Sequence, residues 1–368
     1  MKQKLFGMGA AGNKAAMLAT ESNIIEKENV ILFNSTATDI PRSYDGQVIE
    51  FPGNVGGTGK DRNISKRQAK LAIDNKSIDL KTLLSDADGN QVDQVIFVTS
   101  TDGGSGSGST TVIAEYIHKT FKMPVMIFAI IGRPKDIRGS RNTVEFFKEI
   151  GNKFTVAIIE NKKVAEGPDD TNDSAIEAKA NAEFCRELSL FLGNQIEDDN
   201  MEQNLDEREL YKLRTTPGYT IMSTTIFDNK IKNIEQTRKE VAESLDNICN
   251  PDPDNKDMAR LGLVYNCDRE ESSFMDVLPV IKDKFGLAFE VFTHRQYNNK
   301  SPRIVGIIMA GLAMPMKEIQ DIYEEYKEAT SMINKQEDNF FNSIKTMEFD
   351  DSDSFFEGDD DIDSLLGL

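Results

Sequence analysis

Several features on which many enzymes and membrane proteins depend are scarce in this chain. It has three cysteines, all far apart, and only two histidines. An odd number of scattered cysteines argues against a disulfide framework or a zinc cluster, and two histidines give little support to a histidine-rich metal site or a Ser-His-Asp triad. No apolar run is long enough to cross a bilayer, so we expect no membrane partner.

Positive charge is also in short supply. The formal net charge is −19, which disfavours direct nucleic-acid binding through a basic face. Part of this charge is local, because 348–368 holds nine acidic residues and no basic one. Such a tail cannot bury a core, and we expect it to be disordered in isolation. Most acidic blocks only keep a protein soluble, but Phe355, Phe356 and the terminal leucines could anchor this one on a partner surface.

Glycine and serine are concentrated in 99–110, which reads Thr-Ser-Thr-Asp-Gly-Gly-Ser-Gly-Ser-Gly-Ser-Thr. This stretch lies between the apolar run Val95–Val98 and the amphipathic segment Val112–Ile117, so we predict a loop between a buried strand and a helix. Glycines let the backbone fold closely around a ligand, and the following helix adds a positive dipole end. The pattern favours a di- or triphosphate site, and the alternative is a flexible linker.

Two further glycine loops come earlier in the chain. Gly7–Asn13 contains Gly-x-Gly-x-x-Gly after a short strand, and a second loop spans 53–60. Dinucleotide-binding folds use the first pattern too, so an NAD-dependent Rossmann-type enzyme is the rival interpretation. That fold should end its second strand with an acidic residue, whereas Val30–Phe33 is followed by Asn-Ser-Thr. Three separated loops indicate several strand ends that converge on one ligand.

The segment Asp102–Gly108, Asp-Gly-Gly-Ser-Gly-Ser-Gly, resembles the Gly-Gly-Gly-Thr-Gly-(Ser/Thr)-Gly signature of the tubulin/FtsZ superfamily. It is not a Walker loop, since no Gly-Lys-Ser/Thr follows the glycines. The resemblance covers roughly 5–312. It implies an α/β fold with a parallel-sheet GTP-binding domain, a long central helix, a smaller α+β activating domain, a C-terminal helix and an acidic tail. The corresponding boundaries are 1–173, 174–200, 201–315, 316–347 and 348–368.

The resemblance also implies a GTP site with residues from each of these loops. They are Gly9, Ala10, Gly12, Asn13, Gly57, Thr58, Gly59, Gly103, Gly104, Ser105, Gly106, Ser107, Asp136, Arg141, Asn161 and Asn181. In the family, amides at the last two positions meet the guanine, which a side-chain amide suits because it both donates and accepts. The chain departs from the pattern at Thr36 and Asp102, and at Glu177, where the family has an aromatic that stacks on the base. For Lys60, a solvated surface amine and a phosphate contact are both open interpretations.

The segment 204–210, Asn-Leu-Asp-Glu-Arg-Glu-Leu, resembles the FtsZ loop Asn-x-Asp-x-x-Asp-Val, with Glu209 for the second Asp. A spacing of three places Asp206 and Glu209 on one side of a helical turn, where two carboxylates could polarise a single water. Acidic residues are also common in a first helical turn because the dipole favours them. The resemblance implies that the next subunit of a filament delivers this catalytic pair to the bound GTP.

Magnesium should bridge the nucleotide phosphates and be held mainly by them, with no protein ligand assigned. Asp102, beside the expected phosphates, is hypothesised to bond metal-bound water or backbone N–H groups. Lys2 and Lys4 lead directly into a strand and a glycine loop, so no secretory signal is expected and the cytoplasm is the predicted compartment. The resemblance implies that this is the cytoplasm of a bacterial host.

The predicted function is therefore a GTP-binding and GTP-hydrolysing cytoskeletal protein that polymerises head-to-tail into dynamic filaments. The departures and the acidic tail most resemble the divergent phage and plasmid branch of bacterial tubulins, which implies plasmid segregation or phage DNA positioning. An FtsZ-like cell-division protein, a non-hydrolysing filament protein and the NAD-dependent enzyme remain as alternatives. The tail is expected to contact an adaptor or a neighbouring subunit.

Overall fold

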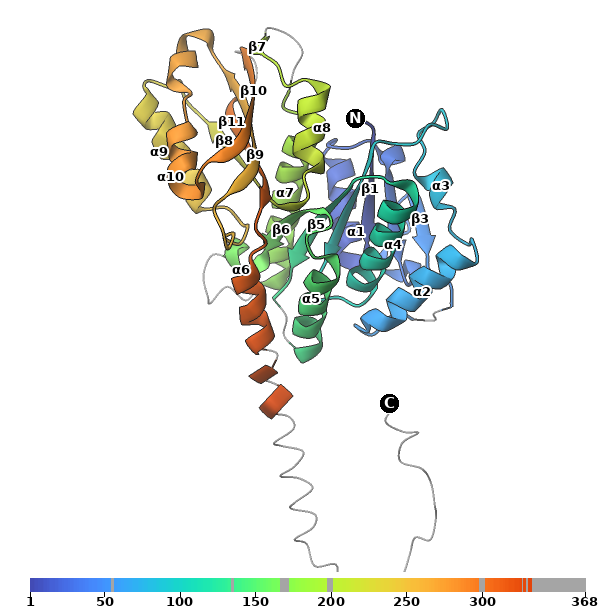
Figure 1. Cartoon of the computed structure of the whole chain (residues 1–368). Coiled ribbons are helices and arrows are strands. Elements are labelled where there is room, and N and C mark those ends of the chain that lie inside the picture. Colours follow the sequence, from blue (N-terminus) through green and yellow to red (C-terminus); the bar gives the residue numbers. More distant parts are fainter. Residues whose placement is uncertain are drawn as a thin grey trace, which may run out of the picture. The chain divides into compact units, whose positions relative to one another are not determined.

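Figure 1 shows a computed structural model of the chain, which describes residues 1–53, 56–133, 136–165, 172–196, 201–297, 302–325, 327–328 and 330–332. Residues 1–325 form one compact unit, and the chain from 326 belongs to a second. A helix begins at 316 as expected, and its first part runs to 325. The predicted remainder of that helix beyond 332 and the acidic tail lie outside the described residues.

Eleven strands of the described chain form one sheet, in the order β3-β2-β1-β4-β5-β6-β8-β11-β9-β10-β7. The strands are β1 (Gln3–Met8), β2 (Val30–Asn34), β3 (Gln47–Glu50), β4 (Gln94–Ser100), β5 (Val125–Ile131), β6 (Thr155–Glu160), β7 (Met201–Gln203), β8 (Gly218–Phe227), β9 (Met258–Cys267), β10 (Ala288–Tyr297) and β11 (Arg303–Leu312). All pairings from β3 through β8 are parallel, whereas β11 runs antiparallel to both β8 and β9.

Helices cover both faces of this sheet (Figure 1). They are α1 (Gly9–Glu21), α2 (Arg62–Asp74), α3 (Leu80–Leu83), α4 (Ser105–Phe121), α5 (Ile137–Ile150), α6 (Asn161–Val164), α7 (Asp173–Leu192), α8 (Glu207–Thr215), α9 (Ile234–Asp246) and α10 (Leu278–Phe285), with the 3-10 turns η1 (Lys27–Asn29), η2 (Ala37–Asp39) and η3 (Arg269–Phe274). No helix in the part of the chain that the structure describes is long and apolar enough to cross a membrane.

The core has two clusters, one on each face of the sheet. Strand β4 shows how the alternation of side chains divides them. Val95 and Phe97 join the cluster that contains residues of α2, α4 and α5, whereas Ile96 and Val98 join the one that contains residues of α1 and α7. Because both faces are covered, the parallel strands are apolar at nearly every position. This is why the sequence shows them as continuous apolar runs.

The elements match the expected α/β architecture, with small differences at their ends. The strand expected at Val125–Ile131 is β5 itself. The long helix expected within 174–200 is α7, which ends at Leu192 because Gly193 adopts a left-handed conformation, φ 75°, and its N–H bonds back to Leu190 O. Glycine takes this conformation without the steric cost of a Cβ, so it ends helices.

Gly12, near the start of α1, packs directly against the backbone of the sheet. A Cβ on Gly12 would stand 2.1 Å from the carbonyl oxygen of Val98 and 3.2 Å from Thr99 Cα. The missing side chain therefore lets α1 lie directly on β4. This contact explains Gly12 through packing, since the residue is buried in the helix and does not need a ligand beside it.

We predict that Gly12→Ala lowers the free energy of unfolding by about 1–3 kcal/mol, because the new methyl group would collide with the backbone of β4. Gly103→Ala is the matched control from the neighbouring loop, since nothing lies within 4 Å of the position its Cβ would take. Urea unfolding of the two variants checks the prediction. Equal midpoints for the two variants would contradict it.

Candidate functional site

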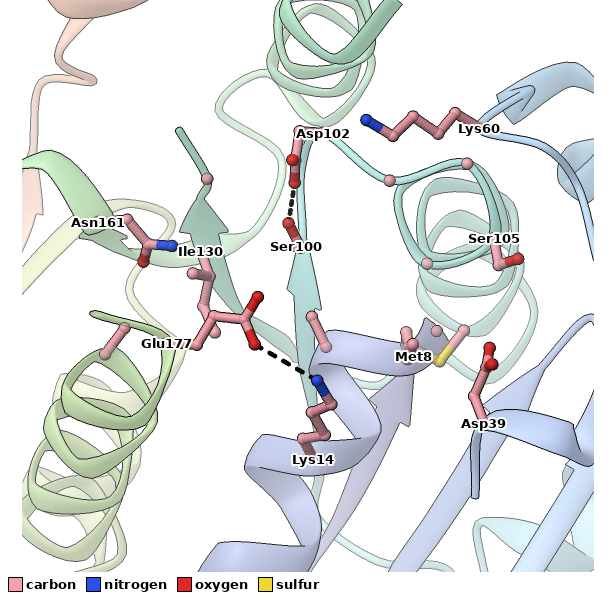
Figure 2. A pocket seen from close by; sticks show the side chains of 18 of the residues that line it. Met8, Lys14, Asp39, Lys60, Ser100, Asp102, Ser105, Ile130, Asn161 and Glu177 are labelled. Atoms are coloured by element: carbon pink, nitrogen blue, oxygen red, sulfur yellow. Dashed lines mark hydrogen bonds and ion pairs between the residues drawn. The ribbon is translucent and has the colours of Figure 1, made fainter. Parts of the chain in front are cut away.

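A cleft of about 450 Å³ lies at the carboxyl edge of the parallel strands (Figure 2). Met8, Asn34 and Ser100 line it from the last positions of β1, β2 and β4, and Ile130 lines it from β5. Ligands of open α/β sheets bind at this edge, where loops from neighbouring strands meet. Of the residues expected in a nucleotide site, the cleft is lined by Gly9, Ala10, Thr58, Gly103, Gly104, Ser105, Gly106, Asn161 and Asn181.

The three glycine loops do converge, and their glycines face one another. A Cβ on Gly106 would stand 2.4 Å from Met8 O, one on Gly104 would stand 2.6 Å from the carbonyl carbon of Lys60, and one on Gly9 would stand 2.7 Å from Gly106 N. Gly9 also has a φ of +71°, which a β-carbon would strain. Gly9, Gly104 and Gly106 are thus required by backbone contact between loops, whereas the Cβ positions of Gly103 and Gly59 are open.

The N-terminus of α4 points its first turn at the cleft, with Ser105 and Gly106 among the lining residues. The first N–H groups of a helix have no partner within it and attract anions. The hydroxyls of Ser107 and Ser109 do not face the cleft. Ser107 is buried and donates to Gly103 O, and Ser109 Oγ donates to Ser105 O at 2.6 Å. These hydroxyls therefore bond within the helix, and Ser107 is not a lining residue.

The loop that contains Gly57, Thr58 and Gly59 is fastened to the start of α5. Lys60 Nζ lies 2.5 Å from Asp136 Oδ2, and Arg138 donates to Gly59 O at 3.0 Å. The hydrogen bond from Lys60 is the main reason why the pKa of Asp136 falls below its ordinary value. Thr58 and Lys60 line the cleft, whereas Gly57 and Gly59 are not among its lining residues.

Two of the expected nucleotide contacts, Asp136 at the N-cap of α5 and Arg141 within α5, do not line the cleft. Asp136 caps this helix by accepting from Gly139 N at 2.7 Å, in addition to its bond with Lys60. Arg141 donates to Glu145 at 2.6 Å and lines a smaller neighbouring cavity. The basic residue of this region that does line the cleft is Arg133, directly after β5.

Asn142 is a residue of this region that the sequence did not single out. It is 4% exposed, and its Nδ2 donates to Lys60 O at 2.9 Å, to Asp102 O at 3.0 Å and to Gly103 O at 3.3 Å. One amide therefore holds two glycine loops together from α5. The sequence could have indicated this role, because Asn142 is a polar residue on the apolar face of an amphipathic helix, one turn before Phe146.

The opposite end of the cleft is formed by α7 and the start of α6 (Figure 2). Asn161 and Asn181 lie there, and the Oδ1 of Asn161 is buried with no hydrogen-bond partner among the described residues. Glu177, the departure from the family pattern, also lines the cleft and binds Lys14 Nζ at 3.3 Å. Asn13, expected at this site, is instead buried under the first loop and donates to Phe33 O at 3.2 Å.

Carboxylates lie near the glycine loops as well. Asp102 accepts a hydrogen bond from Ser100 Oγ, and a Cβ on Gly132 would stand 2.7 Å from its Oδ2 (Figure 2). Asp39, which the sequence left without a role, lines the cleft and accepts from Asn34 at 3.1 Å. Among the described residues no group of three or more His, Cys, Asp or Glu side chains is arranged to hold a metal ion.

The two carboxylates expected to be catalytic form a capping box at the start of α8. Glu209 N donates to Asp206 Oδ1 at 2.8 Å, and Asp206 N donates to Glu209 Oε2 at 3.2 Å. Both residues are on the surface, Asp206 exposed and Glu209 half-buried, and neither lines the cleft of its own chain. The spacing of three therefore serves to cap α8. Each of the two side chains still has a second carboxylate oxygen that the capping box does not use.

A second cavity, of about 540 Å³, adjoins the cleft through Gly132 and Arg133, which line both. Glu160 at the end of β6 is 3% exposed and shares a hydrogen bond with Glu318 of the helix 316–325. Burial, reinforced by the hydrogen bond and charge of Glu318, raises the pKa of Glu160 from an ordinary 4.5 to about 7. The C-terminal helix is thus attached beside the cleft through a pair of carboxyl groups.

No protein-family model matches this chain, and no curated protein sequence matches it. Solved structures do. TubZ of Clostridium botulinum phage c-st has a TM-score of 0.69 at 18% identity, covering 90% of this chain and 100% of that chain. TubZ of Bacillus thuringiensis serovar israelensis, in a GTPγS-form protofilament, has a TM-score of 0.73 at 16% identity, covering 92% and 94%. CetZ2 of Haloferax volcanii, in a GTPγS-bound protofilament, has a TM-score of 0.72 at 16% identity, covering 90% and 100%.

These matches extend through both halves of the sheet and the long helix between them. At such identities they establish the fold, and the chain has the tubulin/FtsZ-like fold that its glycine motifs indicated.

We predict that Asn142→Leu lowers the free energy of unfolding by about 1–3 kcal/mol, because it removes the buried amide that donates to three partly buried carbonyl groups. It should also speed backbone amide exchange at 102–105, where the held loop begins α4. Asn152→Leu, at an exposed position just after α5, is the control. Wild-type exchange rates at 102–105 in Asn142→Leu would show that the amide does not hold the loops.

We predict that the Glu160–Glu318 pair makes stability fall as pH rises. Because the pKa of Glu160 is higher in the folded protein, the folded state keeps a proton that the unfolded state loses above about 4.5. This contribution is present below that pH and is lost as the pH rises through about 7. The glutamine in Glu160→Gln cannot ionise. The free energy of unfolding of this variant, measured in urea, should therefore rise relative to that of the wild type between pH 5 and pH 8.

The surface variant Glu21→Gln should follow the wild type over the same range. Parallel pH curves for wild type and Glu160→Gln would refute the assignment.

Proposed function

We propose that this chain is a GTPase of the tubulin/FtsZ superfamily that assembles head-to-tail into filaments in a bacterial cytoplasm. The observation that carries the proposal is the cleft in which three glycine loops and the N-terminus of α4 meet at the carboxyl edge of the sheet. Backbone N–H groups at such a place suit phosphates. The structural neighbours that contain GTPγS, and that form protofilaments, support the guanine nucleotide and the self-association.

In this proposal the phosphates lie against the backbone of Gly9, Gly103 and Gly104 and the first turn of α4. Thr58 and Lys60 face the terminal phosphate from the loop that α5 holds in place. Gly12, Asn13 and Ser107 support these loops from beneath through the packing described above. Gly57 and Gly59 belong to the loop that Arg138 holds by donating to Gly59 O. Asp136 and Arg141 act through Lys60 and α5, and they do not touch the ligand.

The base lies at the other end, where Ile130 provides an apolar wall and Asn161 and Asn181 provide amides. The unpartnered Oδ1 of Asn161 is an orphaned acceptor beside the cleft. A buried acceptor without a partner is costly. A donor on a guanine edge would satisfy it, and a side-chain amide can match that edge.

Magnesium fits this site only in company with the nucleotide, because the described residues offer no cluster of three metal ligands. The phosphates would supply most of the ligands, and Asp39 and Asp102, the cleft carboxylates nearest the glycine loops, would accept from metal-bound water. When bound, the ion neutralises charge on the phosphates.

Hydrolysis requires a group that orients water at the terminal phosphate. We assign this to Asp206 and Glu209 of the next subunit, which stand on the surface at the start of α8. Each carboxylate has an oxygen outside the capping box, and the cap holds both side chains in a fixed geometry. An isolated subunit has no such group from these two residues in its own cleft, so turnover should need assembly. Plasmid segregation or phage DNA positioning is the cellular role that we propose.

An NAD-dependent enzyme is the second candidate, because one observation favours it. The strands β3-β2-β1-β4-β5-β6 have the order of a dinucleotide-binding sheet. Against it, β2 ends in Asn34, and Asp39 lines the cleft five positions later than the expected ribose ligand. Binding of NADH without binding of GDP would favour this candidate over the GTPase.

We predict that GTP turnover and light scattering rise together above a threshold protein concentration. Asp206→Asn should still assemble but lose turnover by roughly 10²-fold, because the carboxylate that positions water is gone. Asn is chosen over Ala because it still caps a helix. Turnover that is linear in protein concentration, without a threshold, would overturn the shared site.

Asp79→Asn is the matched control, since Asp79 caps α3 through Lys81 N and Thr82 N and lines no part of the cleft. It should leave both turnover and scattering at wild-type values.

A further inference from the structure

Opposite charges bridge the cleft at the end formed by α1 and α7. Lys14 on α1 and Glu177 on α7 both line it, and their Nζ and Oε2 atoms are 3.3 Å apart (Figure 2). The side chains are 56% and 53% exposed, so the bridge adds little to the stability of the fold. The bridge contributes little to folding, yet it joins the two helices on either side of a ligand cleft. We therefore ask whether it acts on the ligand.

The same end of the cleft lacks an aromatic platform. No Phe, Tyr, Trp or His is among the described residues that line the cleft. Its apolar surface there is aliphatic, from Ile130, Ile176 and Ala180. Aliphatic groups cover a planar ring by contact alone and do not provide the quadrupole attraction of a stacked ring. A base bound at this end therefore needs its attraction from a different kind of group.

We propose that Lys14, held by Glu177, covers the nucleotide base as a charged clasp. The ammonium group lies against the π face of the purine, where the ring quadrupole attracts a cation. Glu177 keeps the flexible lysine over the cleft, and Asn181, one helical turn further along α7, meets the edge of the same base. The proposal rests on the proposed function, because it requires a nucleotide whose base lies at this end.

An ordinary surface ion pair makes the opposite prediction for Glu177. A carboxylate near a polyanionic ligand repels it, so replacement of Glu177 by a neutral residue should tighten binding. In the clasp, loss of Glu177 releases Lys14 from the cleft, and binding weakens. The sign of one substitution therefore separates the two explanations.

The experiment is calorimetric titration of the full chain with GDP and with pyrophosphate, which has no base. GDP avoids both turnover and the assembly that GTP is proposed to drive. Lys14→Met and Glu177→Gln should each lower the affinity for GDP relative to that for pyrophosphate by about fivefold, the effect expected of an exposed cation–π contact. The double variant should be no weaker than Lys14→Met alone, since the two residues act as one unit.

Lys230 and Glu270 offer a matched control, because their exposed ion pair of 2.9 Å joins distant parts of the chain and lines no part of the cleft. Lys230→Met and Glu270→Gln should leave both affinities unchanged. Tighter GDP binding by Glu177→Gln, or an equal loss for GDP and pyrophosphate in Lys14→Met, would overturn the clasp. If the variants match a wild type that binds GDP, only the clasp is wrong. If the wild type binds neither probe, the proposed function is wrong as well.

Discussion

Three loops can meet at one edge of this sheet only because side chains are missing where their backbones touch. Gly106 lies against Met8 O, and Gly104 lies against the end of the 57–60 loop, at separations that no β-carbon would fit. The cleft and its row of backbone N–H groups depend on these contacts. Gly104 and Gly106 are therefore needed first for packing between the loops, and only second to form the ligand-binding surface. Gly103, whose Cβ position is open, is not needed for this packing.

A set of polar side chains then fixes loops that glycine alone would leave loose. Arg62 is 2% exposed and donates from Nη2 to Ser107 O at 3.1 Å, while it binds Glu149 through both of its terminal nitrogens. It thereby ties the start of α2 to the first turn of α4 and to α5. A buried guanidinium is tolerated because carboxylates meet its charge and its two terminal nitrogens donate to carboxylates and a carbonyl. Together with Asn142, it connects the glycine loops to one another and to α5.

The sequence was sufficient to predict the architecture, because the strands and the glycine motif are visible as local patterns of residues. Apolar runs predicted the strands, such as Val125–Ile131, and the motif at 102–108 indicated which fold would contain them. It also identified the loops that line the cleft. It could not predict which side chains connect those loops, since bonds such as Asn142 to Lys60 O join residues 82 positions apart. Arg141 illustrates the limit, because the family resemblance implied a nucleotide contact there and the sequence did not reveal that the side chain donates to Glu145 on the next turn.

The seam between the two halves of the sheet is narrow. Strands β6 and β8 share only two register pairs, Thr155 with Gly218 and Val156 with Tyr219. Few hydrogen bonds there resist a twist of one half against the other, so the rigidity of the joint has to come from side-chain packing. Helix α7 contacts β6 on one side of the seam and β8 and β11 on the other. Together with α8, which contacts β5 on one side and β9 and β11 on the other, it braces the joint, so bending of one half of the sheet against the other would have to disturb the packing of these helices.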